Sequence, residues 1–403
     1  MFVINSIENT KQFKLELQQN IDDVKIRKRR STSITNSEIY SRIFTIETII
    51  FIDQSLIRKF NGNLRDVQRL VLAIMNEVQM IYNFDSLKIR IRILIKKIVY
   101  LDQSAFDIPN PADGDIDLYL DNFCAWQKKL WNRANSTMKW DHALMLTGMD
   151  LYKRLGPGRK NSKVLGLAWV NGMCRPAYSC TLNEGKNFEA SFVIAHEMAH
   201  SLGMLHDGYD NNCDPDQFIM SEKTGPGKIN WSPCSNLYLE NFLTKSKIKC
   251  LETTKSEKSF VKRNDNFEDD RLPGEEYSLD KQCQLALGFK YRSYITPKAP
   301  FNDVCRELWC SAGTWATPAH PALEGSGCNQ GKACYQGQCV SIQSAKQAIK
   351  IKAQAFNRRM AIKKSGLNNN SVTNGSSLAP TFMRKVQRFL KSTLSGIVRF
   401  FSG

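Results

Sequence analysis

The chain has 403 residues, of which 42% are hydrophobic, and a formal net charge of +17 at pH 7. It is long enough for an enzyme domain and a smaller module, and no apolar run approaches the roughly 20 residues of a membrane-spanning helix. Segment 341–403 holds 12 Lys and Arg residues and no Asp or Glu, which leaves only +5 for the first 340 residues. The basicity therefore belongs to the tail, and nucleic-acid binding by the body of the protein is not indicated.

Residues 1 to about 40 are polar and charged, and the first twenty lack the apolar region of a signal peptide. Four consecutive basic residues, Arg27 to Arg30, precede a Ser/Thr-rich stretch. We therefore expect residues 1–30 to be the end of a propeptide that a convertase removes; a solvated basic loop is the alternative.

Twelve cysteines, an even number, fall into two groups of six, between Cys124 and Cys250 and between Cys283 and Cys339. So many cysteines predict disulfide bonds formed in an oxidising compartment, and hence secretion. Because no signal peptide is visible, we expect the sequence to be an incomplete gene model or a fragment that lacks its secretory start.

From residue 40 the order of elements predicts an α/β domain that ends near residue 253. We expect a buried strand at 44–52, an amphipathic helix at 63–82, a half-buried strand at 87–100 and a second helix at 118–132. A short strand at 165–173 directly precedes the candidate site. Its free edge could pair with an extended substrate peptide.

The segment His196 to His206 reads HEMAHSLGMLH. On a helix, His196 and His200 lie one turn apart on the same face, where both can bind one metal ion, and Glu197 lies beside a metal-bound water. Gly203 permits a sharp turn that brings His206 round as a third nitrogen ligand. Three imidazoles leave one position of a zinc ion open, which is typical of a catalytic site.

The C-terminal part divides into three segments. After a helix near 236–244, the charged segment 254–271 is a predicted linker, and 272–340 is a predicted disulfide-rich module with little hydrophobic periodicity. The basic tail 341–403 is predicted to be partly helical. Its last 20 or so residues form an amphipathic pattern that could bind an anionic membrane or glycan; a tail that is disordered or folds against the module is the alternative.

Several motifs together resemble one protein family. The zinc segment with Asp207 and a following Met220 resembles the adamalysin or reprolysin type of metzincin. The chain resembles ADAMTS proteases in particular through FCAWQ at 123–127, WSPC at 231–234, LPGE at 272–275, LWC at 308–310 and GQCV at 337–340. This resemblance implies a twisted mixed sheet with long helices, followed by a disintegrin-like module. No thrombospondin repeat follows in this sequence.

The resemblance also assigns residues. It implies that His196, His200 and His206 bind zinc, that Glu197 is the general base, and that Met220 forms a Met-turn below the metal. It implies a structural calcium site at Glu47, Asp141 and the carbonyl of Cys250, with Asp150 near a second calcium cluster. The implied disulfides are Cys124–Cys180, Cys174–Cys250, Cys213–Cys234, Cys283–Cys310, Cys305–Cys334 and Cys328–Cys339.

The function expected from these features is that of a secreted, monomeric zinc endopeptidase that hydrolyses extracellular proteins. Short secreted proteases of this architecture occur in arthropod venoms and saliva. A catalytically silent binding protein with a protease fold is the alternative. An exopeptidase of the gluzincin type would need a Glu as third ligand further downstream, and His206 at the short offset removes that need.

Overall fold

The computed structural model describes residues 36–102, 107–135, 138–223, 225, 227–244, 248–252, 272–352 and 354. The predicted propeptide 1–30, the predicted linker 254–271 and the tail beyond residue 354 lie outside these residues. Within the described part, no helix has both the length and the apolar composition needed to cross a bilayer.

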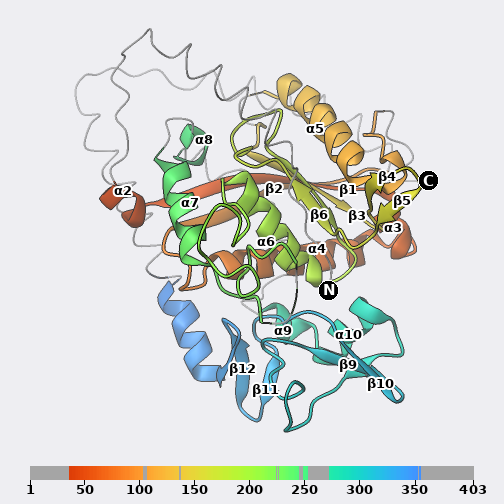
Figure 1. The fold of residues 1–403 in the computed structure, drawn as a ribbon, viewed down its shortest axis with the longest axis vertical. Helices are drawn as coiled ribbons and strands as arrows, with labels where there is room; N and C mark the ends of the chain where they lie inside the picture. The colour runs from red at the N-terminus through yellow and green to blue at the C-terminus, as the bar shows by residue number, and fades with distance from the viewer. Residues whose placement is uncertain are drawn as a thin grey trace, which may run out of the picture. The chain divides into compact units, whose positions relative to one another are not determined.

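A twisted five-stranded sheet forms the centre of the first half of the chain (Figure 1). The strand order is β2-β1-β3-β7-β6, with β1 Ile43–Ile52, β2 Arg90–Tyr100, β3 His142–Thr147, β6 Gly166–Ala168 and β7 Cys180–Glu184. The pairs β1–β2, β1–β3 and β3–β7 are parallel, and β6 pairs antiparallel with β7. The sheet is therefore mixed, and its antiparallel edge strand β6 lies beside the candidate site.

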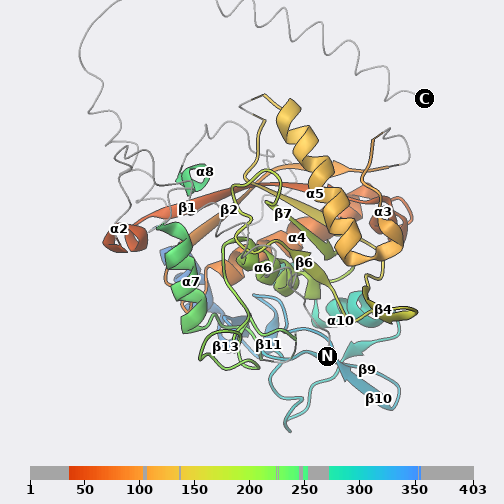
Figure 2. The same cartoon turned by 45° about the horizontal axis from the view of Figure 1, so that its top comes forward.

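Helices cover both faces of this sheet (Figures 1 and 2). Helices α4 Leu64–Tyr82 and α6 Glu189–Ser201 pack on one face, and their apolar sides form one buried cluster with Ile46 and Ile50 of β1. Helix α5 Ile116–Arg133 packs on the other face, against Phe51. The strong apolar stripe of α4 explains this placement, because its buried residues recur at helical spacing.

Polar caps fix where several helices begin. The side chains of Asn63, Asp115 and Ser232 accept hydrogen bonds from the first turns of α4, α5 and α7 Pro233–Leu243. Pro233 stands at the first position of α7, where its missing N–H costs nothing. The remaining elements of this half are α2 Asn36–Ser41, α3 Gln54–Lys59, the 3-10 turn Ala112–Gly114, α8 Lys249–Glu252 and the hairpin of β4 Lys153–Gly156 with β5 Arg159–Asn161.

The second half, from residue 272, is a small module built around its own cysteines. It contains α9 Pro273–Glu276, α10 Leu279–Leu287, a sheet of β8 Arg292–Ser293, β9 Trp309–Ala312 and β10 Trp315–Pro318, and a sheet of β11 Gly327–Asn329, β12 Lys332–Tyr335 and β13 Gln338–Ser341. Residues 342–352 continue as a helix. Few large apolar side chains fill the module, so its disulfides supply much of the constraint.

The module packs directly on α4. Leu323 is fully buried in the same apolar cluster as α4 and α6, and its neighbour Glu324 donates its backbone N–H to Glu77 Oε2 at 3.1 Å. Both carboxyl groups are buried. Burial, and next the charge of Glu324, raise the pKa of Glu77 well above its ordinary value. The two halves therefore share one interior.

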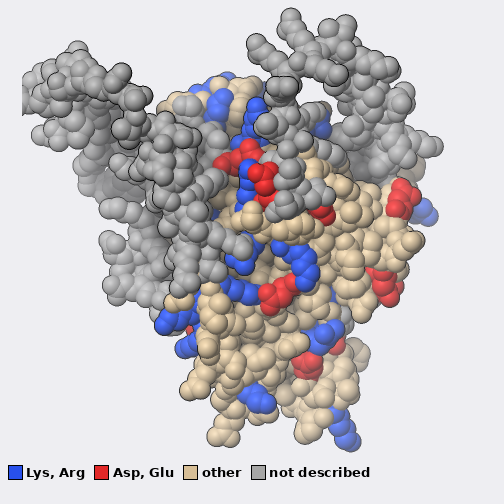
Figure 3. Space-filling model, turned by 90° about the vertical axis from the view of Figure 1, so that its left-hand side faces the viewer, with Lys and Arg blue, Asp and Glu red and all other residues tan. Residues whose placement is uncertain are grey.

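Charged groups are distributed rather than concentrated on the side of the molecule near α2 and α7. Where the described residues form that face, Lys and Arg side chains and Asp and Glu side chains lie among one another (Figure 3).

The predicted α/β class is confirmed: the sheet is mixed and carries long helices. The predicted strand 165–173 is shorter than expected, because only Gly166–Ala168 pairs with β7 and residues 170–173 form turns. The central strands β3 and β7 were not predicted. Both are fully buried and therefore lack the alternation that marks a half-buried strand.

Candidate metal centre

The helix α6 ends in a motif that reverses the chain. Gly203 N–H donates to the carbonyl of His200, and Met204 N–H donates to the carbonyl of Ala199, the two bonds of a Schellman motif. Gly203 has φ +89°, and a Cβ there would lie 2.6 Å from Asn171 Oδ1. Glycine is therefore required at this turn, which returns the chain toward the helix and brings in His206.

The turn brings three imidazoles together. The Nε2 atom of His206 lies 3.1 Å from Nε2 of His196 and 3.1 Å from Nε2 of His200. On the far side of two rings, His196 Nδ1 lies 2.8 Å from the carbonyl of Ile219, and His200 Nδ1 lies 2.8 Å from that of Met204. Carbonyls only accept hydrogen bonds, so both Nδ1 atoms carry the proton and both Nε2 atoms expose lone pairs.

These nitrogen atoms fit a zinc ion. Tetrahedral zinc with Zn–N bonds of about 2.0–2.1 Å places its ligand nitrogens roughly 3.3 Å apart, close to the separations here. Burial lowers the pKa of His196 to about 3 and that of His206 to about 4, and it lowers that of His200 well below its ordinary value. All three rings are therefore neutral near pH 7, which is the form that binds a metal ion.

Glu197 lies on the same helix and is completely buried. Neither of its carboxylate oxygens has a hydrogen-bond partner in the part of the chain that the structure describes. Burial raises the pKa of this carboxyl well above its ordinary value. A buried carboxyl group without a partner is costly for stability, and such groups concentrate at sites of chemistry.

Strand β6 makes room for this carboxyl group. A Cβ on Gly166 would lie 2.9 Å from Glu197 Cγ and 2.5 Å from Asn183 Nδ2. The buried amide of Asn183 also has no partner among the described residues. Sequence analysis missed Asn183, because only the β6–β7 pairing places it beside the site.

The segment with Met220 supports the first histidine. Met220 is completely buried, and its carbonyl accepts a hydrogen bond of 2.9 Å from Asp207 N–H. The carbonyl of the preceding Ile219 is the one that orients His196. Asp207 in turn accepts a 2.6 Å hydrogen bond from Ser232, the N-cap of α7. The described residues between 218 and 232 thus frame the imidazole cluster.

The structure contains six disulfides, and no described cysteine is free. They join the pairs that the resemblance implies: Cys124–Cys180, Cys174–Cys250, Cys213–Cys234, Cys283–Cys310, Cys305–Cys334 and Cys328–Cys339. Cys213–Cys234 ties the segment after the third histidine to the start of α7. Each bridge stays within one half of the chain.

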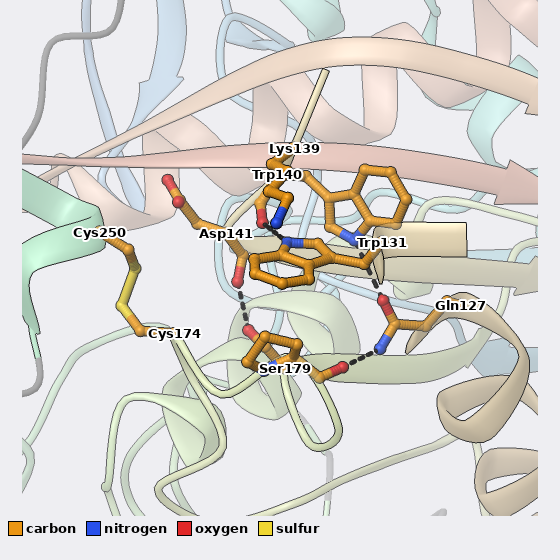
Figure 4. Close-up of a pocket in the computed structure, with 9 residues that line it drawn as sticks. Gln127, Trp131, Lys139, Trp140, Asp141, Cys174, Ser179 and Cys250 are labelled. Atoms are coloured by element: carbon orange, nitrogen blue, oxygen red, sulfur yellow. Dashed lines mark hydrogen bonds between the residues drawn. A yellow bond between two sulfur atoms is a disulfide. The ribbon is translucent and has the colours of Figure 1, made fainter. Parts of the chain in front are cut away.

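The residues expected to bind calcium also come together, but a lysine lies among them. Glu47 N–H donates to Asp141 Oδ2 at 2.9 Å, while Glu47 Oε2 accepts a 2.8 Å bond from Lys96 Nζ. Figure 4 shows the carboxylate of Asp141 turned away from the Trp131 and Trp140 rings, on the side of the Cys174–Cys250 bridge. One of the three expected calcium ligands, Glu47, therefore binds an ammonium group through an oxygen atom that a calcium ion would need.

Asp150, expected near a second calcium cluster, is largely exposed. A lysine again lies close by: Lys186 Nζ is 3.9 Å from Asp150 Oδ1 and 2.5 Å from Glu184 Oε2. Sequence analysis missed both lysines, because a basic residue in a strand or loop gives no local sign of such a role.

Comparisons with known proteins agree with this geometry. The family model described as "Reprolysin (M12B) family zinc metalloprotease" matches residues 45–254, and the one described as "ADAMTS cysteine-rich domain 2" matches residues 273–340.

Several curated proteins are similar over most of this chain. The protein "A disintegrin and metalloproteinase with thrombospondin motifs adt-1" of Caenorhabditis elegans is 33% identical, over 77% of this chain and 22% of its own length. The human proteins of the same description numbered 6 and 3 are 30% and 33% identical, over 80% and 74% of this chain and 28% and 24% of their own lengths. The chain thus spans about a quarter of the length of these relatives. The solved "Structure of a chaperone-substrate complex" aligns with 14% identity over 50% of this chain and 34% of that chain, at a TM-score of 0.32, which carries no weight.

Proposed function

The chain belongs to the reprolysin (M12B) family of zinc metalloproteases, and from this premise we propose that it is an active zinc-dependent endopeptidase. One observation supports the proposal above all others. Three neutral imidazoles point their Nε2 atoms at one another, and an unpartnered carboxyl group, Glu197, is buried on the same helix. This is the donor set and the base that peptide hydrolysis at a zinc ion needs.

In the proposed reaction the residues around the metal site have separate roles. His196, His200 and His206 would hold the zinc ion, which would supply Lewis acidity toward a water molecule and the peptide carbonyl. Glu197 accepts the proton of that water and then donates it to the departing amine. The carbonyls of Ile219 and Met204 hold two of the imidazoles in the Nδ1–H form throughout.

The substrate is proposed to bind along β6. This strand is the last in the sheet order, and among the described residues no strand pairs with its outer edge. An extended peptide could add to this edge through main-chain hydrogen bonds, which would hold substrates of varied sequence. Glu197 packs against Gly166 of the same strand, so a peptide at the edge would run next to the proposed base.

We also propose that the protein acts outside the cell, as a monomer, on extracellular proteins. Six disulfides and no free described cysteine support an oxidising compartment. In this proposal residues 40–253 form the catalytic domain, 272–340 the cysteine-rich module, and Met220 the floor of the metal site.

The proposal is tested by replacing Glu197 with Gln in the full chain. We expect zinc content and the thermal unfolding midpoint to stay near those of the wild type. Cleavage of a denatured protein should fall at least 10²–10⁴-fold, because general acid–base catalysis contributes that much. Glu189→Gln is the matched control, since it makes the same change on the first turn of α6, away from the imidazoles. It should retain full activity.

The same assay separates the enzyme from a catalytically silent binding protein. An enzyme loses cleavage both in the Glu197→Gln variant and after zinc is removed by a chelator. If the wild-type protein holds one zinc ion and cleaves nothing under any condition, or if the variant cleaves as well as the wild type, the proposed role of Glu197 is wrong.

A further inference from the structure

A buried ammonium group lies at a β-bulge in the pairing of strands β1 and β2. Lys96 Nζ lies 2.8 Å from Glu47 Oε2 and 2.7 Å from the carbonyl oxygen of Lys139. The side chains of Lys96 and Glu47 are only 8% and 7% exposed. A lysine this deep in a protein is uncommon, since burial of the charge is costly unless oxygen atoms satisfy it.

A β-bulge directs this lysine inward. Thr48 of β1 pairs with Ile95, and Ile49 pairs with Lys97, so Lys96 is the extra residue between two regular pairs. A bulge turns a side chain out of the alternation of its strand. The neighbouring Lys97 is exposed, whereas Lys96 reaches Glu47.

The surrounding oxygen atoms have the chemistry of a site for a hard cation. They comprise the Glu47 carboxylate, the Lys139 carbonyl and the adjacent Asp141 carboxylate, whose Oδ2 accepts from Glu47 N–H. The segment 139–141 and the Cys174–Cys250 bridge line one pocket of about 70 Å³ (Figure 4). Carboxylates and backbone carbonyls gathered from distant segments are the ligands that calcium takes in proteins.

Calcium and Lys96 cannot both use these atoms. Calcium needs six to eight oxygen ligands at about 2.3–2.6 Å, and Nζ already lies within hydrogen-bond distance of two of the available oxygens. An ion bound to the same two atoms would compete with the ammonium for the space between them. The ammonium also balances the charge of the Glu47 carboxylate, which lies 2.8 Å from it.

We propose that the ammonium of Lys96 is a built-in substitute for a divalent cation, so that the catalytic half folds and stays folded without calcium. The bulge directs the Lys96 side chain toward Glu47, whose carboxylate carries the opposite charge, and the Lys139 carbonyl is a second hydrogen-bond acceptor. The inference does not rest on peptidase activity, since it concerns the stability of the fold.

Lys186 provides a second, independent example nearer the surface. Its Nζ lies 2.5 Å from Glu184 Oε2, and Glu184 Oε1 accepts a 2.7 Å bond from Leu151 N–H. The side chain of Lys186 is 24% exposed, so water also solvates its ammonium group and weakens the ion pair. We therefore base the test on Lys96, where burial makes the effect larger.

The test is thermal unfolding of the zinc-loaded full chain, with and without millimolar calcium, and with magnesium as the ion control. The wild-type midpoint should not respond to calcium. Lys96→Met keeps the volume and loses the charge, which leaves Glu47 buried without its partner. Breaking a buried ion pair in this way should lower the midpoint by roughly 10 °C, and calcium should not restore it, because the methionine fills the space.

Lys96→Ser removes both the charge and the bulk, so it should also unfold at a lower temperature, but calcium should raise its midpoint again. Lys97→Ser is the matched control on the same strand, and its midpoint should stay near that of the wild type. A wild-type midpoint that rises with calcium overturns the proposal, even if Lys96→Ser fails to fold. So does a folded Lys96→Ser protein that ignores calcium.

Discussion

Gly337 of the cysteine-rich module lies against the segment that frames the metal centre, and it can be used to measure that contact. Its φ is +69°, and an added Cβ would lie 1.6 Å from Ile229 Cδ1. Ile229 is buried. The module makes a second contact with the same segment, because Gly227 N–H donates a hydrogen bond of 3.0 Å to the carbonyl of Arg306. Gly337→Ala therefore forces the two halves of the molecule apart locally.

The cost has two parts. A non-glycine residue in the left-handed region costs roughly 1–2 kcal/mol. Overpacking a buried contact costs roughly 1–3 kcal/mol, and the terminal methyl group of Ile229 must here turn aside within packed surroundings. We therefore expect Gly337→Ala to lower the free energy of unfolding by about 2–5 kcal/mol, measured by urea denaturation of the disulfide-intact chain.

Two further variants separate the backbone cost from the overpacking cost. Gly313 has nearly the same φ, +68°, with no atom within 4 Å of the position of its Cβ, so Gly313→Ala shows the backbone cost alone. Ile229→Val deletes only Cδ1, the clashing atom, at a cost of about 0.5–1.5 kcal/mol. In the double variant, Ile229→Val should recover part of the loss caused by Gly337→Ala. If Gly337→Ala is no more destabilising than Gly313→Ala, the contact between module and segment is not as tight as described.

Two further predictions concern the site and the module. Gly166→Ala would place a methyl group 2.7 Å from Val193 Cγ1 and 2.9 Å from Glu197 Cγ. We therefore expect the free energy of unfolding to fall by roughly 1–3 kcal/mol and kcat to fall at unchanged zinc content. An unchanged kcat would show that the added methyl group does not displace Glu197. Burial lowers the pKa of His320 from 6.5 to about 4, so the folded state disfavours its protonation. Stability is therefore complete above pH 6.5 and falls as the pH decreases toward 4, by up to about 3 kcal/mol from this group, and a His320→Gln variant should show a flatter dependence in urea titrations at several pH values.

The parts of the molecule that sequence could predict are local in the chain. The long helix α4 and the strand β2 follow from periodicity, and the strand β1 follows from a β-branched apolar run, each within ten to twenty residues. The imidazole cluster lies within the eleven residues His196 to His206, so its spacing alone brings the rings together. The family and the α/β class are confirmed, whereas the roles of these residues in zinc binding and catalysis stay predictions.

The parts that sequence could not predict depend on long-range pairing. Lys96 reads as one more basic residue in an alternating strand, and only the bulge against β1 turns it toward Glu47. Asn183 and Glu197 both lie beside Gly166 only because β6 and β7 pair at this residue. The calcium expectation illustrates the difficulty: the acidic residues stand at the expected positions, and the cation that neutralises one of them comes from a strand 49 residues away in the sequence.

The shared interior between α4 and the module bears on how the protein can be divided. Truncation before residue 272 would remove Leu323 from the main apolar cluster and the backbone donor from Glu77. The newly exposed surface of α4 would then be an apolar patch around the carboxyl group of Glu77. An exposed apolar patch of this kind favours self-association. Each half has its own disulfides, but each also buries apolar surface against the other. The smallest fragment of this chain that buries this surface therefore includes both halves.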